Sequence, residues 1–464
     1  MATKKTAHKA PVKKAREPRG SSGEVHVRMY RQGLGDCFLI TLPRKGREPF
    51  YLMIDCGVIL GTPHPADLMA PVVRDIAATT KGHVDLLLAT HEHWDHLSGF
   101  VQVRDLFNAI HFENVWLAWT EDPMDSLANQ LRDEHQKLRA ALTTAAVRLH
   151  IGGNSDGALT KMLEFFGAAG QGTTGDALKV VKGFCKNPRF CRPSDEPVEF
   201  ENVDARLYIL GPPHDLAKIK RFNPSKANPE TYGLAQMFLD GGATQLVDSE
   251  LNSPFDPIVR IPFEAAGQAR FFQDHYWGEC CESAARAGEK DIETDQSWRR
   301  IDGAWLDASS SLALQLDSAT NNTSLVLAIE LGDGRVLLFA ADAQVGNWLS
   351  WQDLEWEVNG EKVTGPDLLS RTVLYKTGHH GSHNATLKDK GLELMKRLEI
   401  ALIPVDHQMA IKKGWDKIPL EELENVLNRM TGGRVLRIDR PIPSALQDQV
   451  THDPGEKVYY EVSL

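Results

Sequence analysis

The chain has 464 residues, of which 42% are hydrophobic and 25% are charged. This composition is typical of globular proteins and excludes wholesale disorder, and the length allows about two to four domains or one domain with large insertions. No run of about 18 apolar residues occurs, so we expect no membrane-spanning helix. Six cysteines are too few for a disulfide scaffold, and no secretory signal pattern is present, so we expect a reducing, cytoplasmic environment.

The formal net charge of −11 is distributed unevenly along the chain. Residues 1–22 hold seven lysines and arginines against one acid and lack apolar periodicity, which predicts a disordered basic tail. The rest of the chain is therefore more acidic than the total, and an acidic surface does not attract polyanions. A nucleic-acid partner would need the tail or a local basic groove. The simpler interpretation is that the tail is only a solvated segment.

Apolar runs of strand length alternate with helix-length segments, a pattern typical of an α/β layered core. The predicted strands are VHVRMY up to residue 30, followed by 37–42, 50–55, 83–90, 114–119, 205–212, 324–331, 335–342, 372–377, 400–405 and 434–439. The sequence Gly-Asp-Gly between two of them predicts a hairpin turn.

Two segments have the periodicity of helices. Residues 121–150 place leucines three and four positions apart, with Asp122 as a candidate N-cap and Pro123 suited to the first turn. A second helix is expected at about 419–430. Residues 213–310 show no clear pattern.

The most informative segment is His91-Glu92-His93-Trp94-Asp95-His96, which directly follows a predicted buried strand. His91 and His93 are two positions apart, so their side chains point the same way at a strand end. Asp95 and His96 follow where the chain can bend and present them to a second ion. Imidazole and carboxylate groups are ligands that zinc or manganese takes in proteins. The segment therefore predicts a metal site.

This string matches HxHxDH, the signature of the metallo-β-lactamase fold superfamily, and the chain resembles that superfamily elsewhere too. The further motifs are, in chain order, a GxGD turn at Gly33–Asp36, an IDxG motif containing Asp55, an NNxS motif at Asn321–Ser324, Asp342 at the end of a strand, and HHGS at 379–382. Their order is most similar to the ComEC-like subgroup of metal-dependent hydrolases. The similarity covers roughly residues 25–120 and 320–440.

The resemblance implies an α/β fold, a four-layer αββα sandwich with a large inserted subdomain. It places the first half of the core at 23–120 and the second half at 319–464. Residues 121–318 would form an insertion or lid with one core strand near 205–212. A lid over the substrate is the favoured role, because insertions in such folds lie on loops at the site. An oligomerisation or stability element is the alternative.

The resemblance also implies two divalent metal ions, with Zn²⁺ the first choice and Mn²⁺ an alternative. His91 and His93 would hold one ion, Asp95, His96 and His380 the other, and Asp342 would bridge them. His380 is favoured over its neighbour as the ligand, and His379 would donate a hydrogen bond or a proton to the leaving oxygen. Asp95 and His379 are thus the candidate catalytic residues. The candidates for orienting ligands or contacting substrate are Asp36, Asp55, Asn322, Ser382, His383 and His407.

One departure from the superfamily pattern concerns a metal ligand. Many members carry a further histidine between the signature and the bridging aspartate, where this chain has Asn322, or Asn321 in an alternative alignment. ComEC-like relatives share the substitution, which leaves one ion with fewer protein ligands. His214 is an alternative ligand, although a histidine after a Pro-Pro pair is usually only a loop residue.

These ligands predict hydrolytic chemistry. Two ions about 3.5–4 Å apart can share a water and lower its pKa toward about 7. We therefore expect a phosphodiesterase in which a metal-bridged hydroxide attacks the substrate, with a nuclease acting on a single strand as the leading version. The alternatives are hydrolysis of a small molecule, such as a phosphocholine-type ester, a cyclic nucleotide or a lactam or lactone, and a non-catalytic interaction protein on the same fold.

Overall fold

The computed structural model describes residues 23–151, 173–193, 195–225, 230–231, 268, 270–271, 316–453 and 458–464. The basic tail predicted at 1–22 lies outside these residues, as does most of the predicted insertion beyond residue 231. In the described part of the chain, no helix combines the length and the apolar composition needed to cross a bilayer.

An eight-stranded mixed sheet contains the first half of the core. Its strands, in order across the sheet, are β16 (Val450–His452), β17 (Tyr459–Ser463), β1 (His26–Tyr30), β2 (Phe38–Leu42), β3 (Phe50–Ile54), β4 (His83–Leu88), β5 (His111–Ala118) and β6 (Arg189–Cys191). Pairs from β16 to β3 are antiparallel and pairs from β3 to β6 are parallel. β3 and almost all of β4 are buried on both faces, which explains their continuous apolar sequences.

A seven-stranded mixed sheet contains the second half. Its strands, in order, are β15 (Val435–Arg437), β14 (Ile400–Ile403), β13 (Thr372–Lys376), β10 (Val336–Phe339), β9 (Val326–Leu331), β8 (Ala205–Gly211) and β7 (Val198–Glu199). Pairs from β15 to β10 are parallel and the others antiparallel. The predicted hairpin joins β9 and β10.

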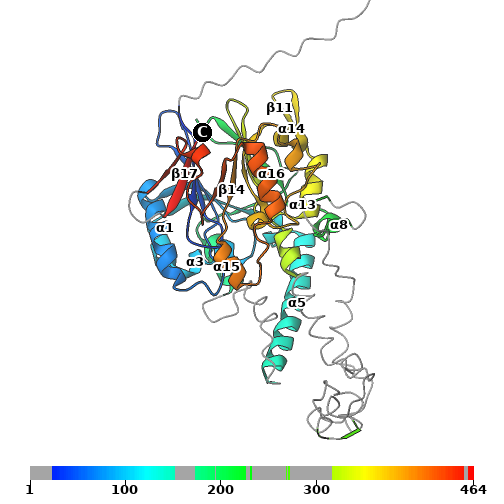
Figure 1. The fold of residues 1–464 in the computed structure, drawn as a ribbon. Coiled ribbons are helices and arrows are strands. Elements are labelled where there is room, and N and C mark those ends of the chain that lie inside the picture. The colour runs from blue at the N-terminus through cyan, green and yellow to red at the C-terminus, as the bar shows by residue number, and fades with distance from the viewer. Residues whose placement is uncertain are drawn as a thin grey trace, which may run out of the picture.

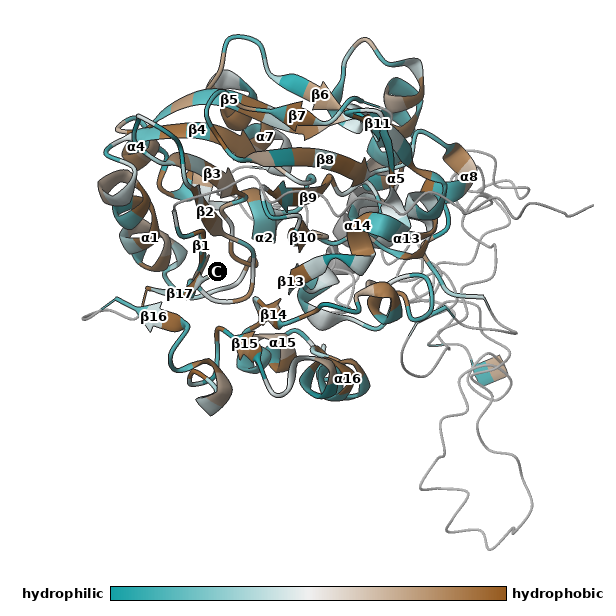
Figure 2. Ribbon diagram, turned by 90° about the horizontal axis from the view of Figure 1, so that it is seen from above, coloured by the Kyte–Doolittle hydropathy of each residue, from teal (hydrophilic) through white to brown (hydrophobic). Residues whose placement is uncertain are grey.

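The two sheets pack face to face around one apolar cluster that takes side chains from both. Phe38 of β2 and Phe339 of β10 meet edge to face across it, with ring centroids 5.7 Å apart. Figure 2 shows how hydrophobic the strands are. The described chain is therefore mixed α/β, as the alternation of apolar runs predicted.

Helices cover the outer faces of both sheets (Figure 1). The first sheet is covered by α1 (Pro65–Thr79), α3 (Gly99–Gln102) and α7 (Thr174–Gly183), and the second by α13 (Val345–Ser350), α14 (Gly365–Ser370), α15 (His407–Lys412) and α16 (Glu421–Thr431). The remaining elements are α2 (Trp94–Leu97), α4 (Arg104–Phe107), α5 (Ser126–Ile151), α8 (Leu216–Ile219), a hairpin of β11 (Glu355–Val358) and β12 (Glu361–Thr364), and the 3₁₀ turns η1 (Trp119–Glu121), η6 (Trp351–Asp353), η7 (Gly378–Gly381), η8 (Leu392–Leu394) and η9 (Ser444–Leu446).

The start of α5 corrects the predicted helix at 121–150. Asp125, rather than Asp122, makes the capping bond, because its Oδ1 accepts the Ala128 N–H at 3.0 Å. The preceding residues form η1, in which the Trp119 ring is fully buried. Both aspartates satisfy the N-cap preference, and the sequence alone does not reveal that burial of Trp119 delays the helix.

The expected insertion at 121–318 also needs correction. Three of its strands enter the sheets instead of one, because β6 extends the first sheet and β7 and β8 form an edge of the second. β6 has three residues and β7 has two, which is too short for a periodic signal. Described residues between 173 and 211 therefore belong largely to the core.

Candidate metal centre

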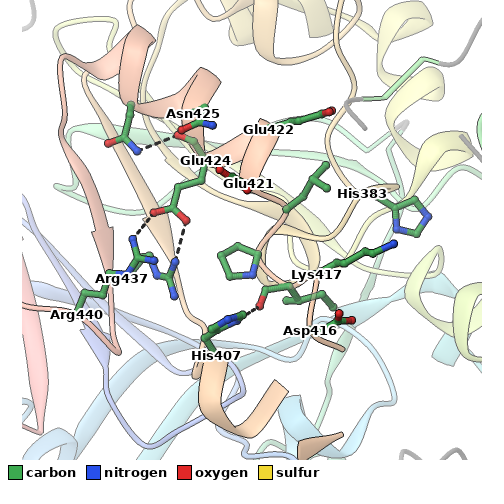
Figure 3. Close-up of a pocket in the computed structure, with 14 residues that line it drawn as sticks. His383, His407, Asp416, Lys417, Glu421, Glu422, Glu424, Asn425, Arg437 and Arg440 are labelled. Carbon is green, nitrogen blue, oxygen red and sulfur yellow. Dashed lines mark hydrogen bonds and ion pairs between the residues drawn. The ribbon is translucent and has the colours of Figure 1, made fainter. Parts of the chain in front are cut away.

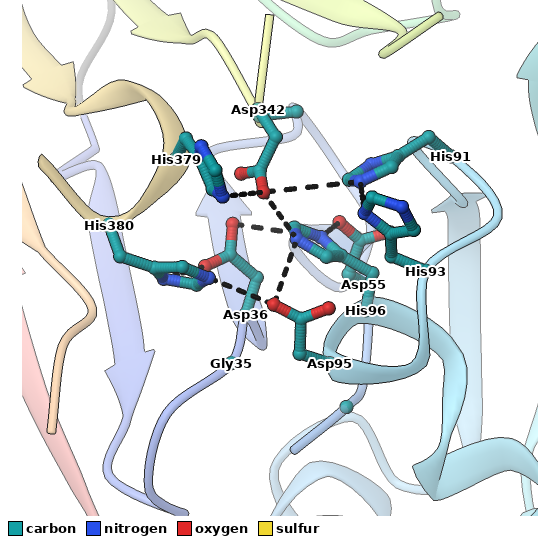
Figure 4. Close-up of polar contacts among 12 residues, drawn as sticks. Gly35, Asp36, Asp55, His91, His93, Asp95, His96, Asp342, His379 and His380 are labelled. Atoms are coloured by element: carbon teal, nitrogen blue, oxygen red, sulfur yellow. Dashed lines mark hydrogen bonds and ion pairs between the residues drawn. The ribbon is translucent and has the colours of Figure 1, made fainter. Parts of the chain in front are cut away.

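Four strand ends bring the predicted site together. Asp55 follows β3, the segment 91–96 follows β4, Asp342 lies just beyond β10, and the histidine pair 379–380 follows β13. Figure 4 shows these side chains pointing toward one another. Residues that are far apart in the sequence thus converge at one edge of the facing sheets, where open α/β folds usually bind their ligands.

Two glycines allow the chain to pack closely against α2. A Cβ atom on Gly57 would lie 2.4 Å from the backbone carbonyl carbon of Asp95, and one on Gly35 would lie 2.6 Å from the backbone carbonyl oxygen of Asp95. Gly35 also has a φ of 152°. The Asp36 N–H donates to the same Asp95 oxygen at 3.0 Å. The GxGD and IDxG motifs therefore pack closely against the turn that contains Asp95 and His96 and hold it in place.

Asp95, His96, Asp342 and His380 form a compact buried cluster. Each offers one ligand atom, and all four atoms lie within 4.8 Å of one another. His380 Nε2 is 3.0 Å from Asp95 Oδ2, and His96 Nε2 is 3.2 Å from Asp342 Oδ2. These are the residues that the resemblance assigned to the second ion and its bridge, and they could hold a metal ion.

His91 and His93 lie beside this cluster. His91 Nε2 is 3.1 Å from His93 Nδ1 and 3.9 Å from Asp342 Oδ2. The structure thus brings the first predicted ligand pair to the bridging aspartate, in a more open arrangement than the neighbouring four-residue cluster.

Each of these four imidazoles has its outer nitrogen near a second group. His91 Nδ1 is 3.0 Å from Thr90 Oγ1, His93 Nε2 is 3.6 Å from Asp317 Oδ1, His96 Nδ1 is 2.7 Å from Asp55 Oδ2, and His380 Nδ1 is 2.8 Å from the Pro404 carbonyl. Metal-binding histidines almost always have such outer partners, which fix the ring and its tautomer. The arrangement leaves the inner nitrogen of each ring facing the cluster.

The cluster also contains polar atoms without hydrogen bonds. Asp95 Oδ1, His96 Nε2 and Asp342 Oδ2 are buried and make no hydrogen bond to any described residue. A buried polar atom without a partner is costly, and a divalent cation would satisfy all three. The mixed nitrogen and oxygen donors suit Zn²⁺ or Mn²⁺.

Neighbouring charges set the protonation of the cluster. Burial opposes ionisation of Asp342, but His96, His379 and Lys376 together hold its pKa well below the ordinary value. Burial also opposes protonation of His96, but the surrounding carboxylates raise the pKa of His96 well above its ordinary value. Burial and the neighbouring imidazoles instead lower the pKa of His91. A proton on His96 therefore occupies the position that a metal ion would take.

The loop that carries the histidine pair is strained. His379 has φ 42° and His380 has φ 51°, so two consecutive non-glycine residues adopt the left-handed region. Such residues cost of order 1–3 kcal/mol each and cluster at functional sites. The His379 N–H donates to the Ala341 carbonyl at 3.0 Å, and the His379 carbonyl accepts from Ser382. This geometry turns the His379 ring toward Asp342 and the His380 ring toward Asp95 (Figure 4).

His379 is more accessible to solvent than the other four histidines of the site. Its side chain is 16% exposed, whereas those of the other four histidines are at most 2% exposed. Ser382 donates to Asn384 Oδ1, so Ser382 Oγ accepts from His379 Nδ1 at 3.0 Å. His379 Nε2 then carries a lone pair, 3.9 Å from Asp342 Oδ2. Burial, with a contribution from His380, lowers the pKa of His379 to about 4.

The two predicted orienting aspartates have different partners. Asp55 accepts hydrogen bonds from Thr90 N and Thr90 Oγ1 and contacts His96. Asp36 pairs with the buried Lys376 at 2.5 Å. Both therefore act on neighbours of the cluster, as their motifs suggested.

His383 and His407 lie apart from the cluster. They line a groove of about 810 Å³ beside the HHGS loop, shown in Figure 3. His407 Nδ1 is 2.7 Å from the Ile418 carbonyl, and Leu420 N–H donates to the Gly381 carbonyl. The groove therefore adjoins the loop of the histidine pair without including its ligands.

Asn322 and His214 do not supply a ligand to the cluster. The Asn322 amide donates to the Ile219 carbonyl and accepts from the N–H groups of Gln344 and Asn347. It thus braces the chain around Asp342, which corresponds to the orienting role among the two roles predicted for it, rather than to contact with substrate. His214 pairs with Asp125 at 2.8 Å, so the alternative ligand prediction is wrong. The sequence could not show that the side-chain amide of Asn322 forms its hydrogen bonds with backbone groups.

Sequence reasoning missed three residues at this site. Asp317 approaches His93 from the end of the expected insertion, Lys376 pairs with Asp36, and Ser324 Oγ lies 3.3 Å from His91 Nδ1. A lysine in the apolar run TVLYKT was the available signal for Lys376. Asp317 had no comparable signal.

Comparisons with known proteins add no assignment. No family model matches the chain, and no curated protein matches it. The interpretation of the site therefore depends on the contacts described above.

Proposed function

We propose that the chain belongs to the metallo-β-lactamase fold superfamily and is a dinuclear metal-dependent hydrolase, with a phosphodiester as its substrate. The observation that carries this proposal is a set of four buried imidazoles around two carboxylates. Nε2 of His91, His96 and His380 lies within 3.9 Å of Asp342 or Asp95, and Nδ1 of His93 lies 3.1 Å from His91 Nε2. The paired sheets with helices on both outer faces support the αββα sandwich implied by the resemblance.

The residues divide the work of such a site. His91 and His93 would hold one ion, Asp95, His96 and His380 the other, and Asp342 would contact both. Bound divalent ions supply Lewis acidity and make water a stronger nucleophile. Asp55 keeps His96 in the ligand tautomer by accepting from Nδ1.

His379 is placed to move a proton. Its Nε2 lone pair faces the cluster, so it can accept a proton from the attacking water and return it to the leaving oxygen. The sequence predicted that His379 donates a hydrogen bond or a proton to the leaving oxygen. The contact with Ser382 instead places the proton of neutral His379 on Nδ1, so Nε2 must first accept a proton before it can donate one.

A small phosphodiester is the second candidate, favoured by the charge of the groove in Figure 3. Asp416, Glu421 and Glu422 line it alongside Lys417. Glu424 already pairs with Arg437 and Arg440 on the same surface. Four acidic and three basic side chains line the groove, so it has no excess positive charge that would attract a polyanionic strand. The nuclease version instead requires the strand to approach along another path.

The test combines metal analysis with a substrate screen. We expect close to two ions per chain, and hydrolysis of bis-p-nitrophenyl phosphate but not of a chromogenic lactam. Single- and double-stranded DNA and RNA, assayed at low and moderate salt, separate a nuclease from a small-molecule hydrolase. His91→Ala should lose activity, whereas His83→Ala, at the start of the same strand, should keep it. Absence of both metal and turnover would favour the interaction protein.

A further inference from the structure

A buried lysine lies beside the cluster, and the hydrolytic scheme above does not use it. Lys376 is the last residue of β13 and is 1% exposed. Its Nζ is 2.5 Å from Asp36 Oδ2, 3.0 Å from the Ala341 carbonyl and 3.5 Å from Asp342 Oδ1. A buried ammonium needs such partners, because an unpaired charge in the interior is very costly.

The lysine makes the two oxygens of Asp342 different. Oδ1 faces Lys376. Oδ2 faces His96 Nε2 at 3.2 Å, and His91 Nε2 and His379 Nε2 at 3.9 Å each. Three imidazole nitrogens from two separate segments of the chain thus surround one carboxylate oxygen, which makes no hydrogen bond to a described residue.

We propose that Lys376 is a positioning residue that reserves a single oxygen of Asp342 for metal ions. The inference rests on the proposed function, because it presupposes that the cluster binds divalent cations. A carboxylate whose two oxygens are both free can bind a single ion through both of them. In Asp342, Lys376 occupies Oδ1, so only Oδ2 would remain for the metal ions. Asp36 holds the lysine in this position through its ion pair with Nζ at 2.5 Å.

The decisive variant is the double substitution Lys376→Met/Asp36→Asn. Lys376→Met alone leaves Asp36 as a buried carboxylate without its cation, and such a protein can fail to fold. The double variant removes both charges of the pair together and keeps similar side-chain volumes. Lys182→Met is the control for removing a lysine from an ion pair, because Lys182 is half-buried and pairs with Glu121.

Mn²⁺ alone is the probe, with binding measured by equilibrium dialysis and electron paramagnetic resonance. We expect the wild type and Lys182→Met to bind two ions that are magnetically coupled through the shared oxygen. We expect the double variant to bind its second ion at least tenfold more weakly and to lose the coupled spectrum.

The outcomes separate this inference from the proposed function. A wild type that binds no Mn²⁺ would overturn both. A wild type that binds only one ion would likewise overturn both, because the proposed function is dinuclear. A double variant that keeps two coupled ions at wild-type affinity would overturn the role of Lys376 alone. In the latter case the lysine would only balance charge.

Discussion

Asp55→Asn tests whether outer partners tune the site. Asp55 is fully buried and accepts from Thr90 N at 2.8 Å, from Thr90 Oγ1 at 2.6 Å and from His96 Nδ1 at 2.7 Å. Asparagine has nearly the same shape, but one of its two terminal groups donates. Because Thr90 N–H can only donate, the new NH₂ must face His96 and force Nδ1 to accept. The proton of His96 then moves to Nε2, the atom that should bind metal.

The expected loss is that of an outer partner of a metal ligand, about 10–100-fold in metal affinity. This corresponds to about 1.4–2.8 kcal/mol. The measurement is competition for Zn²⁺ against a chromophoric chelator, together with ¹⁵N chemical shifts of the histidine rings, which report the tautomer directly. We expect far-ultraviolet circular dichroism to be unchanged.

Asp85→Asn provides the matched control. Asp85 is also buried and accepts from the Tyr51 N–H and from Arg44, but at the other end of β4. The Asp85→Asn substitution should leave the metal affinity within about twofold of the wild-type value. If Asp55→Asn also stayed within that range, or if His96 kept its proton on Nδ1, the argument for tautomer control would fail.

Three further predictions follow from the same contacts. Asp342→Ala should reduce turnover below detection while the circular dichroism remains native, and retained activity would exclude Asp342 as the shared ligand. Metal affinity should fall as the pH is lowered through the raised pKa of His96, because the proton competes with the ion for Nε2, and calorimetry in two buffers should detect proton release on binding. Gly57→Ala should cost about 2 kcal/mol or more of unfolding free energy, because its Cβ would overlap the Asp95 backbone; an unchanged denaturation midpoint would contradict the proposed close approach.

The strands could be predicted because they satisfy a local rule. The run 50–54 is apolar throughout and the run 83–90 is mostly apolar, and the structure buries β3 and almost all of β4 on both faces. The density of ligand types at 91–96 likewise needs no knowledge of the fold. Features that depend on distant partners could not be predicted in this way, such as the three-residue β6, which forms by pairing with β5.

The unpredicted site residues have the same physical origin. Lys376 and Asp317 are charged side chains in buried positions, where local preference places apolar residues. Their neighbours come from distant segments: Asp36 pairs with the lysine, and His93 lies 3.6 Å from the aspartate. A short stretch of sequence contains no pattern that reveals such a contact between distant residues. The HHGS and GxGD motifs reveal only the backbone turns that position these residues.

Strain and buried charge accumulate at the same place in this molecule. Asp55, Ala341, His379 and His380 are four of the eight non-glycine residues with positive φ in the described chain. Ala341, His379 and His380 carry or directly precede a group of the cluster, and Asp55 contacts His96 of the cluster. The His379 N–H bonds to the Ala341 carbonyl, so two strained segments hold each other. A fold under selection for stability alone has no reason to concentrate these costs. They are explained if the site gains a ligand that binds the inward-facing atoms. The buried atoms of Asp95, His96 and Asp342 that make no hydrogen bond to a described residue lie in a cluster that could hold a metal ion.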